Sequence, residues 1–327
     1  MRCIRLKVVI MFLAAMALPV SGQSPAWPDS SPHRAQMIEV EPDVSVEVLD
    51  WGGSGRTIVL LAGGGNTAHV FDDFAPPLTD RYHVYGVTRR GYGLSSKPGT
   101  GYGVDRLADD VAAVIDRLKI ERPVLLGHSV AGDELSSMGS RHADRIAGLV
   151  CIDAAYDRTD PAWDAINSKL PRTSPGPSDL ESIQALQRLM TRTLGATIPL
   201  SEIYNEFEFT PAGRVGKFRI PQTVAQAIRA GMLKPDYSRI RVPALALYAL
   251  STRIQELPGY QEGDVVVRAA LEEYLALVAV RQLVEIKSFE AGPASARIAR
   301  IPGSHYFFLS NRDATYREID SFISHLR

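Results

Sequence analysis

GHSVAG, residues 127–132, is the stretch of this chain that best indicates its fold. It follows the apolar run Pro123-Val124-Leu125-Leu126 and opens a segment whose apolar residues have helical spacing. The pattern predicts a strand, a sharp turn and a helix, with Ser129 at the tip of the turn. Glycines at both ends leave room for a helix that departs close to the strand before it. By itself the pattern also fits a buried strand followed by a helix that Ser129 caps.

Apolar runs and helical patterns alternate along most of the chain. We expect strands at residues 44–48, 57–61, 83–87, 124–126, 148–152, 242–249 and 296–301, and helices at residues 105–118, 261–289 and 313–326. A helix-like stretch follows the glycines at 63–65. This alternation predicts an α/β fold, with a mostly parallel sheet covered by helices on both faces. Residues 156–238 show helical patterns and no convincing strand, so we expect an inserted helical lid between core segments 37–155 and 239–327.

Composition narrows the class of protein. The chain has 327 residues, 45% of them hydrophobic and 22% charged, with a net charge of −1. This composition is typical of a soluble globular protein and gives no indication of a nucleic-acid partner or of binding to an anionic membrane. Cys151 would be the only cysteine left if the N-terminus were removed, so no intrachain disulfide is expected. The sequence carries no signal for oligomeric state.

The N-terminus has the pattern of a secretory signal peptide. Arg2, Arg5 and Lys7 precede an uncharged, mostly apolar run at residues 8–20. We expect cleavage near Gly22, a linker at residues 23–36, and a secreted or periplasmic protein without a stable membrane anchor. A buried N-terminal strand or an uncleaved anchor remains the alternative, although thirteen apolar residues are few for a membrane span.

A nucleophilic serine needs a base within hydrogen-bond distance, and the base needs a partner that fixes its tautomer. His305 follows the last predicted strand, and Asp153 follows the strand after Ser129. Parallel strands end at the same edge of a sheet, so these three side chains can meet there. Glu256 and Asp264, the first carboxylates after the strand 242–249, are alternative acids.

Two backbone N–H groups would stabilise an oxyanion, and we predict those of Val130 and Gly64, with Gly65 close behind. A rival interpretation is dinucleotide binding. Residues 63–68 fit G-x-G-x-x-A, and Arg89 and Arg90 could meet the 2′-phosphate of NADP in an oxidoreductase. We predict no metal site, because H-E-x-x-H and paired cysteines are absent from the sequence.

Four stretches together resemble the α/β-hydrolase family. They are residues 59–64 (VLLAGG), 90–95 (RGYGLS), 127–132 (GHSVAG) and 303–305 (GSH), and the resemblance covers nearly all of residues 40–327. It implies an eight-stranded sheet, a lid after the sixth strand, no cofactor and a small-molecule substrate. It also implies that Ser129 is the nucleophile and His305 the base.

The sequence departs from the family pattern at two places. Ala62-Gly63 stands where most members have His-Gly, and the usual acid after the seventh strand is missing. Asp153 matches the position of the acid in some haloalkane dehalogenases of this fold. Those enzymes use an aspartate nucleophile, so a serine favours attack on an acyl carbon. We therefore expect a serine hydrolase, most simply a carboxylic ester hydrolase, acting on an ester, thioester or lactone of a small apolar acid. The alternatives are an amide or carbon–carbon bond hydrolase and a slow or non-catalytic ligand-binding protein.

Overall fold

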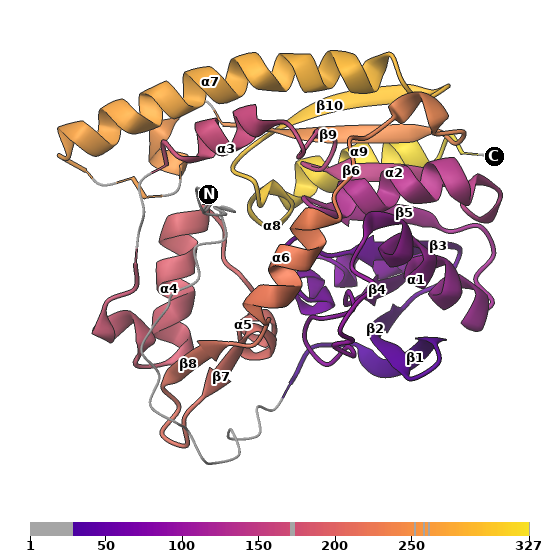
Figure 1. Ribbon diagram of the computed structural model, residues 1–327, viewed down its shortest axis with the longest axis horizontal. Helices are drawn as coiled ribbons and strands as arrows, with labels where there is room; N and C mark the ends of the chain where they lie inside the picture. Colours follow the sequence, from indigo (N-terminus) through magenta and orange to yellow (C-terminus); the bar gives the residue numbers. More distant parts are fainter. Residues whose placement is uncertain (1–28, 171–173, 252, 258, 261, 327) are drawn as a thin grey trace, which may run out of the picture.

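The computed structural model describes residues 29–170, 174–251, 253–257, 259–260 and 262–326, and its centre is an eight-stranded sheet (Figure 1). The strands are β1 (Arg34–Glu41), β2 (Val44–Gly52), β3 (Arg56–Leu61), β4 (Tyr82–Val87), β5 (Val124–His128), β6 (Gly148–Ile152), β9 (Ala244–Leu250) and β10 (Ala296–Pro302). Their spatial order is β1-β2-β4-β3-β5-β6-β9-β10. β2 pairs antiparallel with β1 and β4, and the other neighbours are parallel. The predicted mostly parallel, eight-stranded sheet is confirmed.

Helices cover both faces of this sheet, because the central strands are apolar on both sides. Ile58 and Leu60 of β3 pack in a core with the 3-10 helix η1 (Ala68–Phe71), α8 (Phe307–Ser310) and α9 (Arg312–Ile323). Val59 and Leu61 face the other core, with α1 (Val104–Arg117), α2 (Ala131–Arg141) and the end of α7 (Val265–Glu290). The helix-like stretch after the glycines is a turn followed by two 3-10 helices, η1 and η2 (Pro76–Asp80). Two consecutive prolines at the start of η2 prevent a continuous α-helix there.

In the segment between β6 and β9, α4, α5, β7 and β8 lie together at the lower left of Figure 1, whereas α3 lies beside α7. The elements of this segment are α3 (Pro161–Asn167), η4 (Pro177–Leu180), α4 (Ile183–Leu194), α5 (Leu200–Glu206), β7 (Phe207–Phe209), β8 (Val215–Phe218), α6 (Gln222–Ala230) and η5 (Tyr237–Arg239). The expectation that this segment lacks strands is wrong, because β7 and β8 pair antiparallel. These strands have three and four residues, too few for a period-two pattern to stand out.

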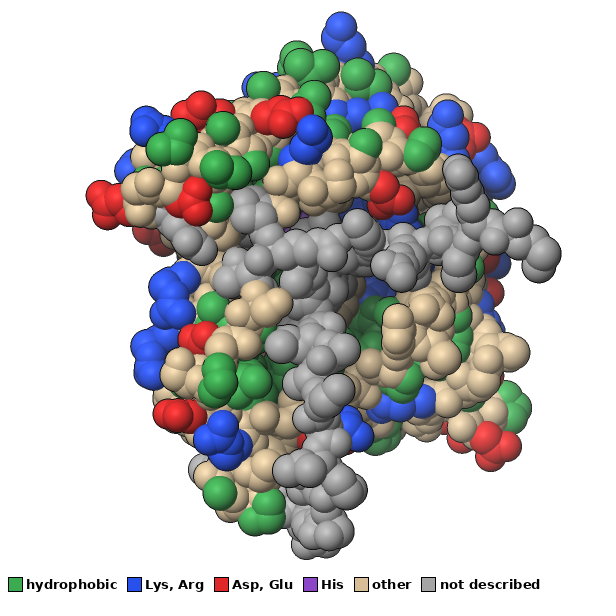
Figure 2. Space-filling view, turned by 60° about the vertical axis from the view of Figure 1, so that its left-hand side comes forward, with side chains coloured by type: hydrophobic (Ala, Val, Ile, Leu, Met, Phe, Trp, Pro, Cys, Tyr) green, Lys and Arg blue, Asp and Glu red, His purple; other side chains and the backbone are tan. Residues whose placement is uncertain are grey.

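β1 begins at Arg34, so the last three residues of the expected linker belong to the sheet. This edge strand is mostly exposed and carries little apolar alternation, which is why the sequence pattern missed it. The expected signal peptide and its cleavage site lie outside the described residues and stay predictions. No described helix is both long and apolar enough to cross a membrane. On the face shown in Figure 2, basic and acidic side chains are interspersed.

Candidate active site

Ser129 occupies a strained turn between β5 and α2. Its φ angle is 55°, a left-handed conformation that is uncommon for a residue with a side chain and typical of a nucleophile elbow. The turn is also tight, since a Cβ atom added to Gly132 would lie 1.9 Å from the carbonyl oxygen of Ala154. α2 has Val130 as its N-cap and no side-chain capping bond. The alternative in which Ser129 caps the helix is therefore wrong.

His305 and Asp153 meet at the carboxyl edge of the sheet. His305 Nδ1 lies 2.6 Å from Asp153 Oδ2. Asp153 Oδ1 accepts hydrogen bonds from the backbone N–H of Ala249 at 3.0 Å and from the hydroxyl of Tyr156 at 2.6 Å. Burial by itself would raise the pKa of Asp153, but the bond to His305 and the two other donors outweigh burial and hold this pKa below its usual value. Asp153 is therefore a carboxylate that orients the imidazole of His305.

No hydrogen bond joins the Ser129 hydroxyl to His305 in the part of the chain that the structure describes. Ser129 is half-buried, and the side chain of His305 is 43% exposed. Catalytic hydrogen bonds in free enzymes are often long and tighten only when substrate is bound. The structure thus brings His305 and Asp153 into contact and places Ser129 at the same edge of the sheet.

Two side chains behind Asp153 extend this network and were missed by the sequence analysis. Gln282 of α7 donates to the hydroxyl oxygen of Tyr156 at 3.2 Å and to the carbonyl of Ala249 at 3.0 Å. Tyr156 in turn donates to Asp153 Oδ1, the carboxylate oxygen that does not contact His305. Tyr156 lies only three residues after Asp153, which was an available signal, whereas nothing in the sequence relates Gln282 to it.

The other two candidate acids have different positions. Asp264 is the N-cap of α7, and its Oδ1 accepts hydrogen bonds from the N–H groups of Val266 and Val267, both at 3.0 Å. The backbone of Glu256 ends the 3-10 helix η6 (Ile254–Glu256), and its side chain is outside the described part of the structure. The partner that the structure gives His305 is Asp153.

His128 supports the loop that carries His305. Its Nε2 lies 3.1 Å from the carbonyl oxygen of His305, and the two imidazole rings are 4.5 Å apart at their centroids. Complete burial lowers the pKa of His128 well below its usual value, so the ring is neutral. His128 is therefore a structural neighbour of Ser129 that connects the elbow to the loop after β10.

The glycine loop after β3 packs directly on the elbow. A Cβ atom added to Gly63 would lie 3.2 Å from Ser129 Cβ and 2.8 Å from His128 Nδ1, so only glycine fits there. Gly63 accepts from the N–H of Asn66 at 3.3 Å, and Gly65 has a φ angle of 88° within this turn. Within the described residues no hydrogen-bond acceptor is found for the N–H groups of Gly64 and Val130, so both are free to receive an oxyanion.

A buried guanidinium holds this loop in place. Arg89 donates to the carbonyl oxygens of Ala62 at 2.9 Å and Gly63 at 3.2 Å. Its Nε bonds Glu134 of α2, and both side chains are almost completely buried. Arg89 therefore fixes the loop to the elbow helix, at the place where the usual histidine of the loop is replaced by Ala62.

This arrangement contradicts the NADP interpretation. The guanidinium of Arg89 is bonded to Glu134 and the loop carbonyls, and that of Arg90 is bonded to Asp110 at 2.5 Å and to Glu41 at 2.7 Å. Both groups are buried and paired, so neither can receive a 2′-phosphate. The glycine pattern is a loop next to Ser129 instead of a phosphate cradle.

Helix α5 of the inserted segment is fastened to the same loop by two buried glutamates. Glu202 accepts from the N–H and the hydroxyl of Thr67, and Glu206 accepts from Asn66 Nδ2 at 2.9 Å. Asn66 Oδ1 also accepts from the Tyr306 hydroxyl at 3.1 Å. Burial raises the pKa of both glutamates, and the charge of Glu202 raises the pKa of Glu206 further. The inserted segment thus contacts the residues that flank Gly64 and His305.

Comparison with known proteins gives a consistent result. The family model of the alpha/beta hydrolase fold matches residues 56–186. The 2-(acetamidomethylene)succinate hydrolase of Mesorhizobium japonicum is 31% identical over 134 residues, which are 41% of this chain. The matched segment spans about half of the length of the curated relatives, 48% in this case.

Solved structures extend the likeness over most of the chain. The crystal structure of E-2-(acetamidomethylene)succinate hydrolase superimposes with a TM-score of 0.66 at 21% identity, covering 89% of this chain and 99% of the other. The enol-lactonase from Burkholderia xenovorans gives a TM-score of 0.57 at 22% identity, covering 89% and 100%. At these identities the likeness shows a shared fold.

Proposed function

Because this chain belongs to the α/β-hydrolase fold family, we propose that it is a serine hydrolase that acts by acyl transfer on an ester, thioester or lactone of a small apolar acid. The observation that carries the proposal is the 2.6 Å contact between His305 Nδ1 and Asp153 Oδ2, at the sheet edge where Ser129 occupies its strained turn. The substrate class is inferred from the serine nucleophile.

In the proposed reaction, Ser129 Oγ attacks the carbonyl carbon of the substrate and His305 Nε2 accepts the hydroxyl proton. Asp153 holds the Nδ1–H tautomer and stabilises the imidazolium that forms. The N–H groups of Gly64 and Val130 receive the oxyanion, and each such donor lowers the barrier by about 3 kcal/mol. His305 then gives its proton to the leaving group. In the second half of the cycle, His305 takes a proton from the water that attacks the acyl carbon and returns it to Ser129 Oγ, which releases the acid. For this cycle Ser129 and His305 must approach when substrate binds.

Two alternatives have specific observations in their favour. The names of the hydrolase relatives include one that acts on 2-(acetamidomethylene)succinate, and an amide bond is open to the same nucleophile and base. The lack of a Ser129–His305 hydrogen bond among the described residues favours a slow or idle triad in a ligand-binding protein. An amide hydrolase would turn over N-acyl amides in preference to esters, and a ligand-binding protein would turn over neither.

The experiment is a panel of p-nitrophenyl esters, lactones, thioesters and N-acyl amides, tested with the full chain and matched variants. We expect Ser129→Ala to abolish ester hydrolysis and labelling by a fluorophosphonate probe, and Asp153→Asn to lower kcat by about 10⁴-fold because the imidazole tautomer is lost. Ser140→Ala is the control, since that hydroxyl donates to the carbonyl of Ser137 on the same helix. Full activity of a folded Ser129→Ala variant would refute the proposal, and so would the absence of turnover and labelling in the unmodified protein.

A further inference from the structure

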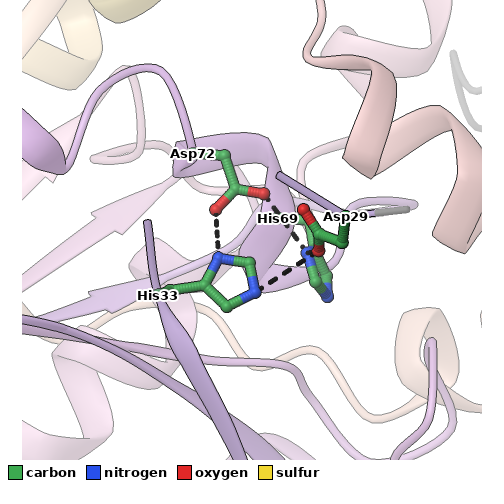
Figure 3. Close-up of side chains that lie close together, drawn as sticks. All are labelled: Asp29, His33, His69 and Asp72. Atoms are coloured by element: carbon green, nitrogen blue, oxygen red, sulfur yellow. Dashed lines mark hydrogen bonds and ion pairs between the residues drawn. The ribbon is translucent and has the colours of Figure 1, made fainter. Parts of the chain in front are cut away.

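Two histidines and two aspartates that are not among the candidate catalytic residues form a cluster (Figure 3). Asp29 and His33 lie just before β1, and His69 and Asp72 lie in and directly after η1. Each of the four offers one ligand atom, and these atoms lie within 4.8 Å of one another. We propose that this cluster binds a divalent transition-metal ion, with Zn²⁺ as the ion that fits best.

The distances between the facing atoms suit a single ion. Asp29 Oδ2 lies 3.4 Å from His33 Nε2 and 3.7 Å from His69 Nδ1. Zinc–nitrogen and zinc–oxygen bonds of about 2.0–2.2 Å in a tetrahedron place neighbouring ligand atoms about 3.3–3.6 Å apart. Small side-chain movements would therefore bring Asp29, His33 and His69 around one ion. Two imidazole ligands favour zinc over calcium or magnesium, which prefer oxygen ligands alone.

Each histidine is also held from behind by a buried carboxylate. His33 Nδ1 lies 2.7 Å from Asp72 Oδ1, and His69 Nε2 lies 3.5 Å from Glu47 Oε1. Metal-binding histidines almost always donate their second N–H to such a partner, which fixes the tautomer and the direction of the ring. The carboxylates leave His33 Nε2 and His69 Nδ1 directed towards Asp29 (Figure 3). Asp72 Oδ2, 3.2 Å from His69 Nδ1, adds negative charge beside the ion.

The charge of the cluster calls for a cation. Asp29, Asp72 and Glu47 bring three negative charges to a region in which Asp72 and Glu47 are buried. Buried charges are stabilised when they are paired or coordinate a metal, so a divalent ion would compensate these carboxylates.

The position of the cluster predicts what the ion would do. Asp72 Oδ2 accepts from the Ser201 hydroxyl of α5 at 2.6 Å, and Asp72 Oδ1 accepts from Trp51 Nε1 of β2 at 3.2 Å. An ion here would join the segment before β1 to η1 and, through Asp72, to α5. We therefore infer a structural role, in which metal binding raises the melting temperature without taking part in the reaction at Ser129.

The test uses the full chain after its metal has been removed with a chelator. A titration with Zn²⁺ in competition with a chromophoric chelator measures the affinity and stoichiometry, and a titration with Co²⁺ followed by absorption spectroscopy reports the coordination geometry. We expect one equivalent of metal per chain, a tetrahedral Co²⁺ spectrum and a rise in melting temperature with added Zn²⁺. Asp29→Asn and His33→Asn should each weaken binding at least 10-fold. Asp29 is exposed, so Asp29→Asn leaves the buried hydrogen bonds of the cluster in place. Weaker metal binding by this variant would therefore not be explained by misfolding.

The matched control is His142→Asn, because His142 pairs with a single aspartate, Asp109, at 2.9 Å and has no second histidine beside it among the described residues. This variant should bind metal like the unmodified protein, as should His305→Asn at the candidate active site. Lack of saturable binding below about 100 μM Zn²⁺ would overturn the proposal, because a structural zinc site binds far more tightly. Unchanged affinity in both Asp29→Asn and His33→Asn would overturn it as well.

Discussion

Arg89 provides the sharpest test of how this chain holds the glycine loop after β3, which we propose as part of an oxyanion hole. Arg89→Met would leave Glu134 as a lone buried charge, which costs about 3–5 kcal/mol of folding free energy. It would also remove the donors to the carbonyls of Ala62 and Gly63, and hydrogen bonds from charged groups contribute about 1.5–3 kcal/mol each. The sum, about 6–11 kcal/mol, is comparable with the whole stability of a typical domain. The single variant should therefore fold poorly.

The double variant Arg89→Met/Glu134→Leu separates stability from activity. It removes both buried charges, so we expect it to recover about 3–5 kcal/mol relative to the single variant in urea unfolding followed by tryptophan fluorescence. The loop carbonyls would still lack their donors, and the N–H of Gly64 would no longer be fixed. We expect kcat to fall by about 10²–10³-fold, as for loss of an oxyanion donor, with little change in KM. A stable double variant with unchanged kcat would refute a positioning role for Arg89.

Two further predictions concern the pH dependence of stability and the packing of the elbow. Because the pKa of Glu206 is raised in the folded state, its contribution to stability is complete below pH about 4 and is lost as the pH rises through the folded-state pKa. We therefore expect Glu206→Gln to have the same free energy of unfolding as the unmodified protein at pH 4 and a higher one at pH 9, measured by urea unfolding. Exposed Glu208→Gln is the control, and an equal difference at both pH values would contradict the reasoning. Gly132→Ala should destabilise the protein by about 3 kcal/mol or more in thermal unfolding, because the added Cβ would lie 1.9 Å from the carbonyl oxygen of Ala154. Gly99→Ala is the control and should be neutral, because a Cβ there has no neighbour within 4 Å.

Local patterns were sufficient for the features that depend on neighbouring residues. The strand and helix around Ser129 follow from apolar spacing and small residues, and His305 and Asp153 follow from their places directly after strands. Parallel strands bring such positions to one edge whatever the side chains elsewhere, so it was predictable that His305 and a carboxylate would meet there. The choice among Asp153, Glu256 and Asp264 stayed open until the structure placed Asp153 Oδ2 at 2.6 Å from His305 Nδ1.

Hydrogen bonds and ion pairs between residues far apart in the sequence could not be predicted from those local patterns. Gln282 contacts Tyr156 across 126 residues, and Asn66 contacts Glu206 across 140. Arg89 looked like a phosphate ligand next to a glycine motif, and its partner Glu134 is on a helix 45 residues away. The cluster around His69 was missed because it joins an aspartate and histidine four residues apart to a histidine and aspartate three residues apart, neither of which is a known motif.

By itself the sequence determined the strand–turn–helix at Ser129, the alternation that produces a parallel sheet and the residues that follow its strands, because these depend on periodicity and on which residues tolerate a tight turn. Only the tertiary structure decided which buried charges pair, which carboxylate orients His305 and how the glycine loop is held. A buried polar group needs hydrogen-bond partners, and the fold supplies them from distant segments. The local sequence of one such segment does not indicate which other segment it will contact.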